Sequence, residues 1–247
     1  MVKADVLKIK VLREIKSNFK NYLSVILIAA LAVTLFTGIW ANYRGFQEKL
    51  DHIYAISDMC DGMITMEKAD DEVRDFFEKH SVEYQSRIFM TAKVGGKSVY
   101  VATFKNDDFL NKPYSSSVAV TDEGVYADEN FAKSHSVGEN FTVETGITLA
   151  KNIELNLTGT IVHPESLGNS IYNPSFLYVG RTALVKSLAK ALEQYKNIFG
   201  YTDEGFENYI SDFLVGYENQ YIFKSDDSKN IISEAQSAFS GKDTYVY

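Results

Sequence analysis

The sequence predicts an α+β protein in which one N-terminal transmembrane helix precedes an extracytoplasmic domain. Residues 22–41 contain no charged side chain, and the residues before them are basic whereas those after them are acidic overall. Beyond residue 58, short alternating patterns typical of strands are mixed with short amphipathic patterns typical of helices. About 200 residues follow the apolar stretch, which is enough for one domain of two lobes or for two small domains.

The apolar stretch is Tyr22–Ala41. Twenty residues in a helix span roughly 30 Å, the thickness of the hydrocarbon core of a bilayer, and a segment in lipid must be helical to pair its own backbone groups. Aromatic residues at both ends suit the two membrane interfaces. The predicted transmembrane helix covers residues 21–41, and its representative side chains are Tyr22, Leu23, Ile26, Leu31, Phe36 and Trp40.

The flanking charges predict the orientation of this helix. Residues 1–20 hold six Lys or Arg against two acidic residues, a net charge of +4, whereas Arg44 and Lys49 are the cations of the next twenty residues. The positive-inside rule therefore places the N-terminus in the cytoplasm and residues after 41 outside, in a single pass of the cell membrane. The alternative is a cleaved signal peptide, whose apolar core is usually about 7–15 residues and ends in a small-residue site, a pattern that Ile39-Trp40-Ala41 does not match.

Residues 1–20 predict a basic amphipathic helix. Leu7, Val11, Ile15 and Phe19 fall on one face of a helical wheel. The opposite face carries the predicted cytoplasmic surface, Lys10, Arg13, Lys16 and Lys20. Such a helix lies on the anionic cytoplasmic leaflet; the alternative is a basic flank without fixed structure that only sets the topology.

Residues 42–57 predict a stalk. Phe46, Leu50 and Tyr54 have helical spacing, so we expect the transmembrane helix to continue out of the membrane. Asp58 and the Asp61-Gly62 pair should end it.

The rest of the chain predicts alternating short elements. The clearest is a hairpin: residues 83–94 alternate in polarity, Gly95-Gly96 supplies a two-residue turn, and residues 97–104 return as a strand. Short strands spaced by turns predict a small all-β lobe at about 117–180. The expected strands are 63–66, 83–94, 97–104, 118–120, 124–126, 141–144, 153–162, 176–179 and 220–224, with a further one beginning at 245. The expected helices are 69–80, 128–135 with Asp128 as N-cap, 183–199, 206–215 and 228–240.

The composition and motifs argue against several functions. The net charge is −8, and subtracting the N-terminal +4 leaves −12 on residues 21–247, so nucleic acid is not an expected partner. The four histidines are scattered, the single Cys60 is interpreted as an inert small residue, and neither a phosphate-binding glycine loop nor a Gly-x-Ser-x-Gly motif occurs. Asp107-Asp108 and Asp226-Asp227 are interpreted as caps rather than acid–base pairs. We therefore expect no metal, no cofactor and no enzymatic activity.

Four parts of the sequence form a familiar order: Leu12–Asn18 leading into Tyr22–Ile28, Val125–Lys133 with Val137–Val143, Leu157–Pro164, and Tyr172–Pro174 with Tyr178–Val179. This order resembles the first half of an FtsX-like permease of an ABC transporter with a MacB-type extracytoplasmic domain. The resemblance covers essentially the whole chain, and Glu139, where Asp is usual, is a mild departure.

The resemblance implies a porter-like α/β lobe made of residues 58–110 and 200–247, an inserted β-rich lobe at 111–182, and a connecting helix at 183–199. It also implies a cytoplasmic ABC ATPase subunit as partner, and pairing with a second permease half or with another copy of the chain. Permeases of this kind have further membrane helices, and the sequence ends within a predicted strand, so we expect the printed sequence to be part of a longer chain.

Two functions remain open at this stage. The first is a permease segment, embedded in the lipid bilayer, whose extracytoplasmic domain couples cytoplasmic ATP turnover to export or mechanotransmission. The second is a signal-anchored extracytoplasmic binding or sensor protein without a transport role, which holds a peptide or a cell-wall fragment in a cleft. Continuation of the reading frame beyond Tyr247 would discriminate between them.

Overall fold

The computed structural model describes residues 2–115, 117–147, 150–163, 165, 174–242 and 244–246, with side chains from residue 7 onward. The chain divides into two compact units, residues Met1–His52 and Ile53–Tyr247, which are taken in turn. Tyr172, Asn173, Pro164 and Tyr247, which belong to predicted motifs, lie outside the described residues.

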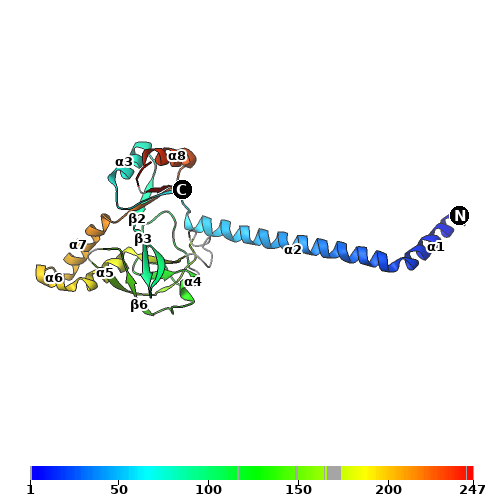
Figure 1. Ribbon diagram of the computed structural model, residues 1–247, viewed down its shortest axis with the longest axis horizontal. Coiled ribbons are helices and arrows are strands. Elements are labelled where there is room, and N and C mark those ends of the chain that lie inside the picture. Colours follow the sequence, from blue (N-terminus) through cyan, green and yellow to red (C-terminus); the bar gives the residue numbers. More distant parts are fainter. Residues whose placement is uncertain are drawn as a thin grey trace. The chain divides into compact units, whose positions relative to one another are not determined.

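The first unit is helical. It contains α1 (Val2–Ser17) and the start of α2 (Phe19–Ser57), with a turn at Asn18 between them (Figure 1). The predicted helices over 1–20, 21–41 and 42–57 are thereby confirmed as helices, and the last two form one uninterrupted helix. Within the described part of the chain, α2 is the one helix long and apolar enough to cross a membrane, and its apolar stretch is not buried by other residues. Phe36 is 72% exposed, so this stretch needs an apolar environment outside the chain.

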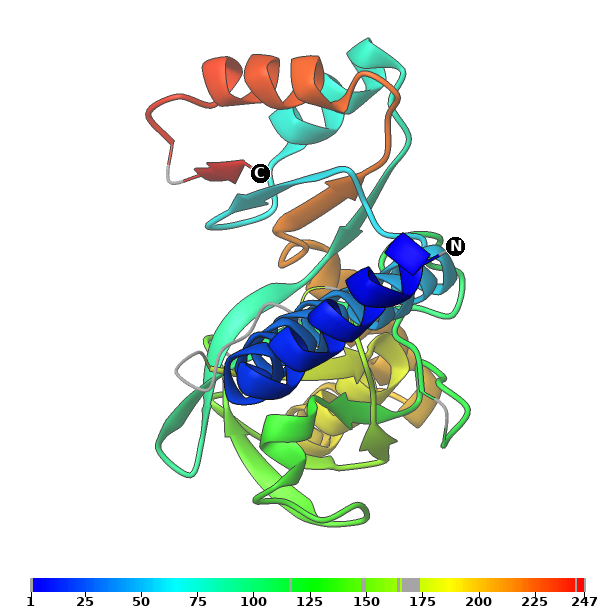
Figure 2. The ribbon, with the colours of Figure 1, turned by 90° about the vertical axis from the view of Figure 1, so that its right-hand side faces the viewer.

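The second unit contains a four-stranded antiparallel sheet in the order β11-β1-β10-β2. Its strands are β1 (Gly62–Met66), β2 (Tyr84–Arg87), β10 (Gln220–Phe223) and β11 (Thr244–Val246). Helices α3 (Asp71–His80) and α8 (Ser228–Ala238) lie together against one face of this sheet (Figure 2). The core between them contains Ile64, Val73, Phe77, Tyr221, Phe223, Ile231 and Ala235.

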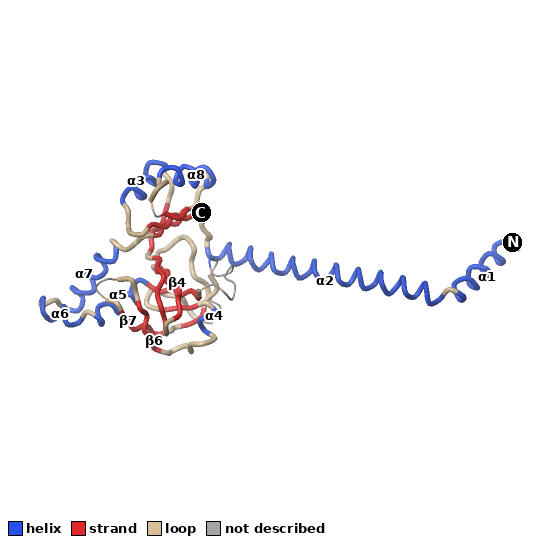
Figure 3. The backbone as a smooth tube through the Cα atoms, viewed as in Figure 1, coloured by secondary structure: helices blue, strands red, loops and turns tan. Residues whose placement is uncertain are grey.

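A seven-stranded mixed sheet forms the rest of the unit, in the order β7-β6-β3-β4-β9-β5-β8 (Figure 3). The pairs β4–β9 and β5–β8 are parallel, and the others are antiparallel. The strands are β3 (Phe89–Val94), β4 (Lys97–Phe104), β5 (Val125–Ala127), β6 (Asn140–Glu144), β7 (Asn152–Asn156), β8 (Gly159–Thr160) and β9 (Ser175–Gly180). The helices are α4 (Glu129–Ala132), α5 (Arg181–Ala191), α6 (Glu193–Phe199) and α7 (Asp203–Val215).

Several local predictions are confirmed. The α+β class holds, and Gly95 and Gly96 form the hairpin turn with φ of 56° and 78°, which joins β3 to β4 with Val94 opposite Lys97. These positive φ angles favour glycine at both positions. Asp128 caps α4, accepting a hydrogen bond from the Phe131 N–H at 2.8 Å.

The strand predicted at 83–94 is wrong as a single element. It breaks at Ile88: β2 pairs with β10 in the first sheet, whereas β3 pairs with β4 in the second. Side chains from β4 and from the residue before β10 bond the backbone at this point: the Ile88 N–H donates to Thr103 Oγ1 at 3.0 Å, and the Phe89 N–H donates to Asn219 Oδ1 at 2.8 Å. Predicted segment 58–110 therefore supplies strands to both sheets.

Four smaller predictions also need correction. The strand predicted at 153–162 is divided into β7 and β8, because the Thr158 N–H leaves the first ladder and donates to the Val125 carbonyl at 2.7 Å. The helix predicted at 183–199 is interrupted at Leu192, with φ −105° and ψ 13°, to give α5 and α6. Residues 118–120 form no strand. Asp227 precedes α8 but its side chain makes no cap hydrogen bond.

Candidate functional site

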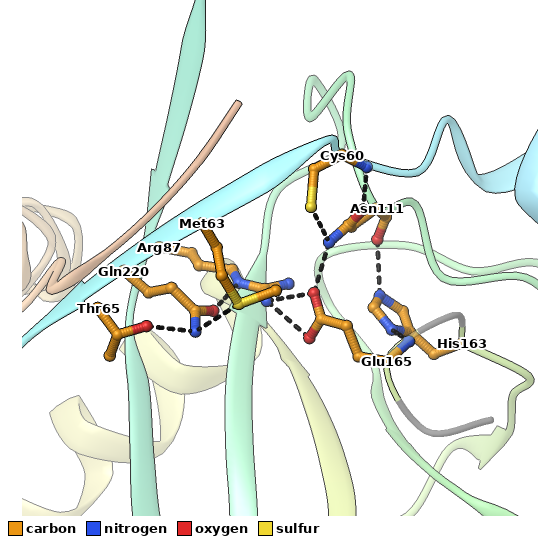
Figure 4. Close-up of polar contacts among 8 residues, drawn as sticks. All are labelled: Cys60, Met63, Thr65, Arg87, Asn111, His163, Glu165 and Gln220. Carbon is orange, nitrogen blue, oxygen red and sulfur yellow. Dashed lines mark hydrogen bonds and ion pairs between the residues drawn. The ribbon is translucent and has the colours of Figure 1, made fainter. Parts of the chain in front are cut away.

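One face of the four-stranded sheet is buried yet polar. Side chains alternate along each strand, so the residues between those that pack on α3 and α8 point to the opposite face. On that face Gln85, Arg87 and Gln220 are 8%, 4% and 3% exposed. Buried polar groups require partners, and these come from two distant segments of the chain. We call this cluster the polar joint and define it as Cys60, Arg87, Asn111, His163, Glu165 and Gln220 (Figure 4).

An ion pair between Arg87 and Glu165 forms the centre of the polar joint. One guanidinium nitrogen, Nη2, donates to both carboxylate oxygens of Glu165 at 2.5 and 2.7 Å. Arg87 Nε donates to Gln220 Oε1 at 2.7 Å, and Gln220 Nε2 in turn donates to Thr65 Oγ1 at 2.9 Å. Burial alone would raise the pKa of Glu165, but the charge of Arg87 and the hydrogen bonds it receives lower that pKa overall.

Asn111 connects this ion pair to the segment that follows α2. Its Nδ2 donates to Glu165 Oε1 at 2.5 Å and to Cys60 Sγ at 3.3 Å, while its Oδ1 accepts from the Cys60 N–H at 2.8 Å. Asn111 adopts a left-handed conformation with φ 48°, which Asn tolerates better than most residues. The side chain therefore joins three parts of the chain.

His163 is neutral within the polar joint. The Glu165 N–H donates to His163 Nδ1 at 3.2 Å, which assigns the proton to Nε2, and Nε2 donates to the Asn111 carbonyl at 2.7 Å. Burial lowers the pKa of His163 to about 4. The ring also stacks on Tyr178, with centroids 4.1 Å apart.

The polar joint holds the C-terminal end of α2. The last carbonyls of a helix have no partner within it. Here the Lys112 N–H donates to the Ser57 carbonyl at 2.8 Å and the Asn111 N–H donates to the Asp58 carbonyl at 3.0 Å. Lys112 Nζ also pairs with Asp58 Oδ2 at 2.8 Å. Helix α2 ends at Ser57, which confirms the predicted end at this point, and Asp58 follows in a left-handed conformation with φ 47°.

The loop that contains Asn111 is fastened to the sheet by Gln85. Gln85 Oε1 accepts hydrogen bonds from the Phe109 and Leu110 N–H groups at 3.0 and 3.1 Å. Asp108 closes a turn in this loop by accepting from the Lys105 N–H at 2.7 Å. Burial raises the pKa of Asp108 to about 6. The loop, the end of α2 and the sheet thus share one hydrogen-bonded network.

The chemistry of the polar joint fits a structural connection between segments of the chain. The carboxylate of Glu165 is committed to Arg87 and Asn111, and burial raises the pKa of the Cys60 thiol, which disfavours the reactive thiolate. Among the residues that the structure describes, no group of three or more His, Cys, Asp or Glu side chains is placed to hold a metal ion. The observed interactions resist separation of the connected segments.

The residues singled out from the sequence lie elsewhere, along the two N-terminal helices. The span residues lie on α2 and are 42–72% exposed; they are Tyr22, Leu23, Ile26, Leu31, Phe36 and Trp40. The basic residues are exposed and lie on α1, except that Lys20 lies in the first turn of α2. Of the stalk residues, Phe46 and Tyr54 are exposed and Leu50 is half-buried.

Sequence reasoning missed the polar joint. The alternating pattern at 83–94 places Gln85 and Arg87 on one face, and that face is the buried one. A signal was present, because three polar residues on neighbouring strands of one sheet face call for a polar cover. Gln85 is bonded by the backbone of Phe109, 24 residues further on, and Arg87 is bonded to Glu165, 78 residues further on; both partners lie in loops without a motif.

A scan against protein-family models finds no match for this chain, and a search of curated proteins finds no similar sequence.

Proposed function

We propose that the chain is the N-terminal part of an FtsX/MacB-like permease, and that its extracytoplasmic domain couples ATP turnover in a cytoplasmic partner to export or mechanotransmission. The observation that supports this most is the polar joint at the end of α2. A helix that merely anchors a domain can end in a loose linker. Here Ser57 and Asp58 are hydrogen-bonded to Asn111 and Lys112 instead.

The continuity of α2 supports the same proposal. One helix, Phe19–Ser57, contains both the apolar stretch and the stalk. Movement of a helix within the membrane is transmitted along its hydrogen-bonded backbone more directly than through a flexible linker. Through Asn111 and Glu165 it would then reach Arg87 on the four-stranded sheet.

In this proposal α1 lies on the cytoplasmic leaflet, residues after 41 are extracytoplasmic, and the cell membrane is crossed once by the described helix α2. The four-stranded sheet with α3 and α8 would serve as the porter-like lobe and the seven-stranded sheet as the β-rich lobe, which assigns β3 and β4 of the predicted segment 58–110 to the second lobe. ATP hydrolysis belongs to a separate ABC ATPase subunit, and a second permease half or a second copy completes the assembly.

Cys60 provides a direct test of coupling, since it is the only cysteine and its thiol contacts Asn111. Native membranes containing the chain would be treated with ATP, and the alkylation rate of Cys60 would be followed by mass spectrometry. The proposal expects ATP to change the alkylation rate of Cys60. A non-hydrolysable analogue should produce only the part of that change that comes from nucleotide binding. An unchanged rate, together with no ATPase co-purifying with the chain, refutes it.

Orientation is tested separately. Lys8→Cys and Tyr195→Cys are placed in a Cys60→Ala background, and intact cells are treated with a membrane-impermeant maleimide. Both positions are exposed to solvent in the structure. The proposed topology expects position 195 to be labelled in intact cells and position 8 to be labelled only after permeabilisation. The reverse pattern excludes this topology.

A second function, an anchored binding or sensor protein, has one observation in its favour. A cavity of about 510 Å³ lies where the two sheets adjoin, lined by Ile88, Phe89, Met90, Ile147 and Tyr217 among others. Its volume falls within the range of small-molecule sites. The substitution Met90→Trp would fill this cavity. The sensor function is favoured if this variant no longer binds a peptide or cell-wall fragment that the wild-type chain binds, and if the alkylation of Cys60 does not respond to ATP.

A further inference from the structure

Large apolar side chains are exposed on α6 and the segment that follows it. Helix α6 contributes no buried residue, and its adjacent Ile198 and Phe199 are 72% and 69% exposed. Single exposed apolar residues are ordinary, but a contiguous group marks an interaction site. We call Tyr195, Ile198, Phe199, Tyr201 and Tyr209 the aromatic patch; all five are exposed.

The aromatic patch surrounds a cavity. Its volume is about 340 Å³, and its lining consists of Leu192, Tyr195, Phe199, Tyr201, Phe206 and Tyr209. Tyr201 stacks on Tyr209 with ring centroids 5.7 Å apart, and it also lies 5.7 Å from the ring of Phe206. Rings fixed by one another lose little freedom on binding. The cavity lies at the small end of the usual range of binding sites, which suits one or two inserted side chains.

The charges around the aromatic patch are acidic. Residues 193–215 contain five acidic residues and one basic residue, a net charge of −4. The single cation, Lys196, is already paired, with its Nζ 2.6 Å from Asp203 Oδ1 and 3.8 Å from Glu193 Oε1. Lys196 thereby engages Asp203 and Glu193, and the other acidic residues of this segment, Glu204, Glu207 and Asp212, keep the sequence around the patch negatively charged.

We propose that the aromatic patch docks a polypeptide segment of a partner protein that presents an aromatic or aliphatic side chain flanked by Lys or Arg. The apolar side chain enters the cavity, and the flanking cations face the acidic rim. Charge complementarity selects this occupant. A second copy would bring together two segments of charge −4, and an anionic lipid surface would be repelled in the same way. The inference holds whether the chain belongs to a transporter or to a sensor.

The test uses the full chain in detergent micelles. The probe is a short peptide, Lys-Lys-Bpa-Lys-Lys, where Bpa is the photoreactive benzoylphenylalanine; after illumination, mass spectrometry locates the cross-link. A peptide with Glu in place of Lys is the charge control. The test variant is Ile198→Ser/Phe199→Ser, and Val137→Ser, at a residue 61% exposed on another surface, is the matched control. All of these positions are exposed, so folding should be retained.

The proposal expects cross-links within residues 192–209 of the wild-type chain and of the Val137→Ser variant, at least tenfold fewer in the Ile198→Ser/Phe199→Ser variant, and none above background with the Glu peptide. Glu193→Gln/Glu204→Gln should weaken the yield several-fold, as should added salt. Equal cross-linking by both peptides, or an unchanged yield in the Ile198→Ser/Phe199→Ser variant, overturns the proposal. So does sedimentation showing a dimer that this variant abolishes, because the patch then belongs to a second copy.

Discussion

Glu165→Gln should loosen the polar joint more than any other conservative change there. Arg87 and Glu165 are 4% and 9% exposed, and removing one member of such a pair leaves a buried charge without compensation, at a cost of about 3–5 kcal/mol. The amide oxygen of Gln still accepts one hydrogen bond, which places the expected loss at about 3 kcal/mol. That loss corresponds to roughly a hundredfold increase in the open population of the joint.

The assay measures the alkylation rate of Cys60 in the full chain at increasing denaturant concentrations. Far-ultraviolet circular dichroism is recorded on the same samples to follow global unfolding. Because Asn111 bonds both Glu165 and the Cys60 thiol, opening of the polar joint exposes the reporter directly. The matched control is Glu154→Gln, which removes an equally conservative carboxylate from an exposed pair with Lys190 at 2.8 Å. We expect the control to behave as the wild-type chain, since exposed pairs contribute little.

A double-mutant cycle completes this test. Arg87→Met alone leaves the burial of Glu165 without its main compensation and so raises the pKa of that carboxyl, and the cost of the substitution should shrink on acidification as the carboxyl takes up a proton. Arg87→Met/Glu165→Gln removes both charges, so its loss should fall short of the sum of the single losses by at least about 1.5 kcal/mol. Additive losses, or a wild-type alkylation rate in Glu165→Gln, would show that the ion pair does not hold the joint.

Three further predictions concern the second unit. Burial raises the pKa of Asp108 from 3.8 to about 6, so the folded chain binds this proton more tightly than the unfolded chain, and the resulting stability is present below about pH 4 and lost as the pH rises through 6. Asp108→Asn should therefore be more stable than the wild type at pH 7, by up to about 3 kcal/mol, and similar to it near pH 4, as measured by denaturant unfolding at both values. In Gly180→Ala, the added Cβ would collide with the Asp122 carbonyl, which predicts a loss of about 1–3 kcal/mol, whereas Gly146→Ala meets no atom and should be neutral; equal melting temperatures would contradict this. Asp128→Ala removes the acceptor of both the Phe131 and Phe176 N–H groups, with an expected loss of about 2–4 kcal/mol; Asp128→Asn should recover part of it, and thermal unfolding of both variants tests this.

Local patterns predicted the local structure of this chain well. The uncharged stretch after residue 21 identified α2, the Gly95-Gly96 pair identified the hairpin, and Asp128 identified a cap, because each depends on a few neighbouring residues. Long-range pairing was not accessible in this way. The alternation across Ile88 is continuous in sequence, yet the strand changes sheets there, where Thr103 and Asn219 bond its backbone.

The polar joint illustrates the same limit for function. The alternation of residues 83–94 placed Gln85 and Arg87 on one face of a strand but did not indicate that this face is buried. The partner of Arg87, Glu165, lies 78 residues further on, in a loop that no periodicity marks. The end of α2 was predicted from Asp58, but the residues that receive it, Asn111 and Lys112, became evident only from the structure.

The strand connectivity of the four-stranded sheet has a consequence for folding during synthesis. Among the strands that the structure describes, β1 pairs with β10 and β11, and Thr65 and Gln220 are 155 residues apart. Ribosomes add about 5–20 residues each second, so β1 and the apolar face of α3 wait roughly 8–30 s for their partners. During that interval Phe77 can stack on Tyr84 of β2, but its contact with Phe223 and the contact of Phe76 with Phe239 are not yet available, so the apolar face of α3 stays partly uncovered until the last part of the domain is made.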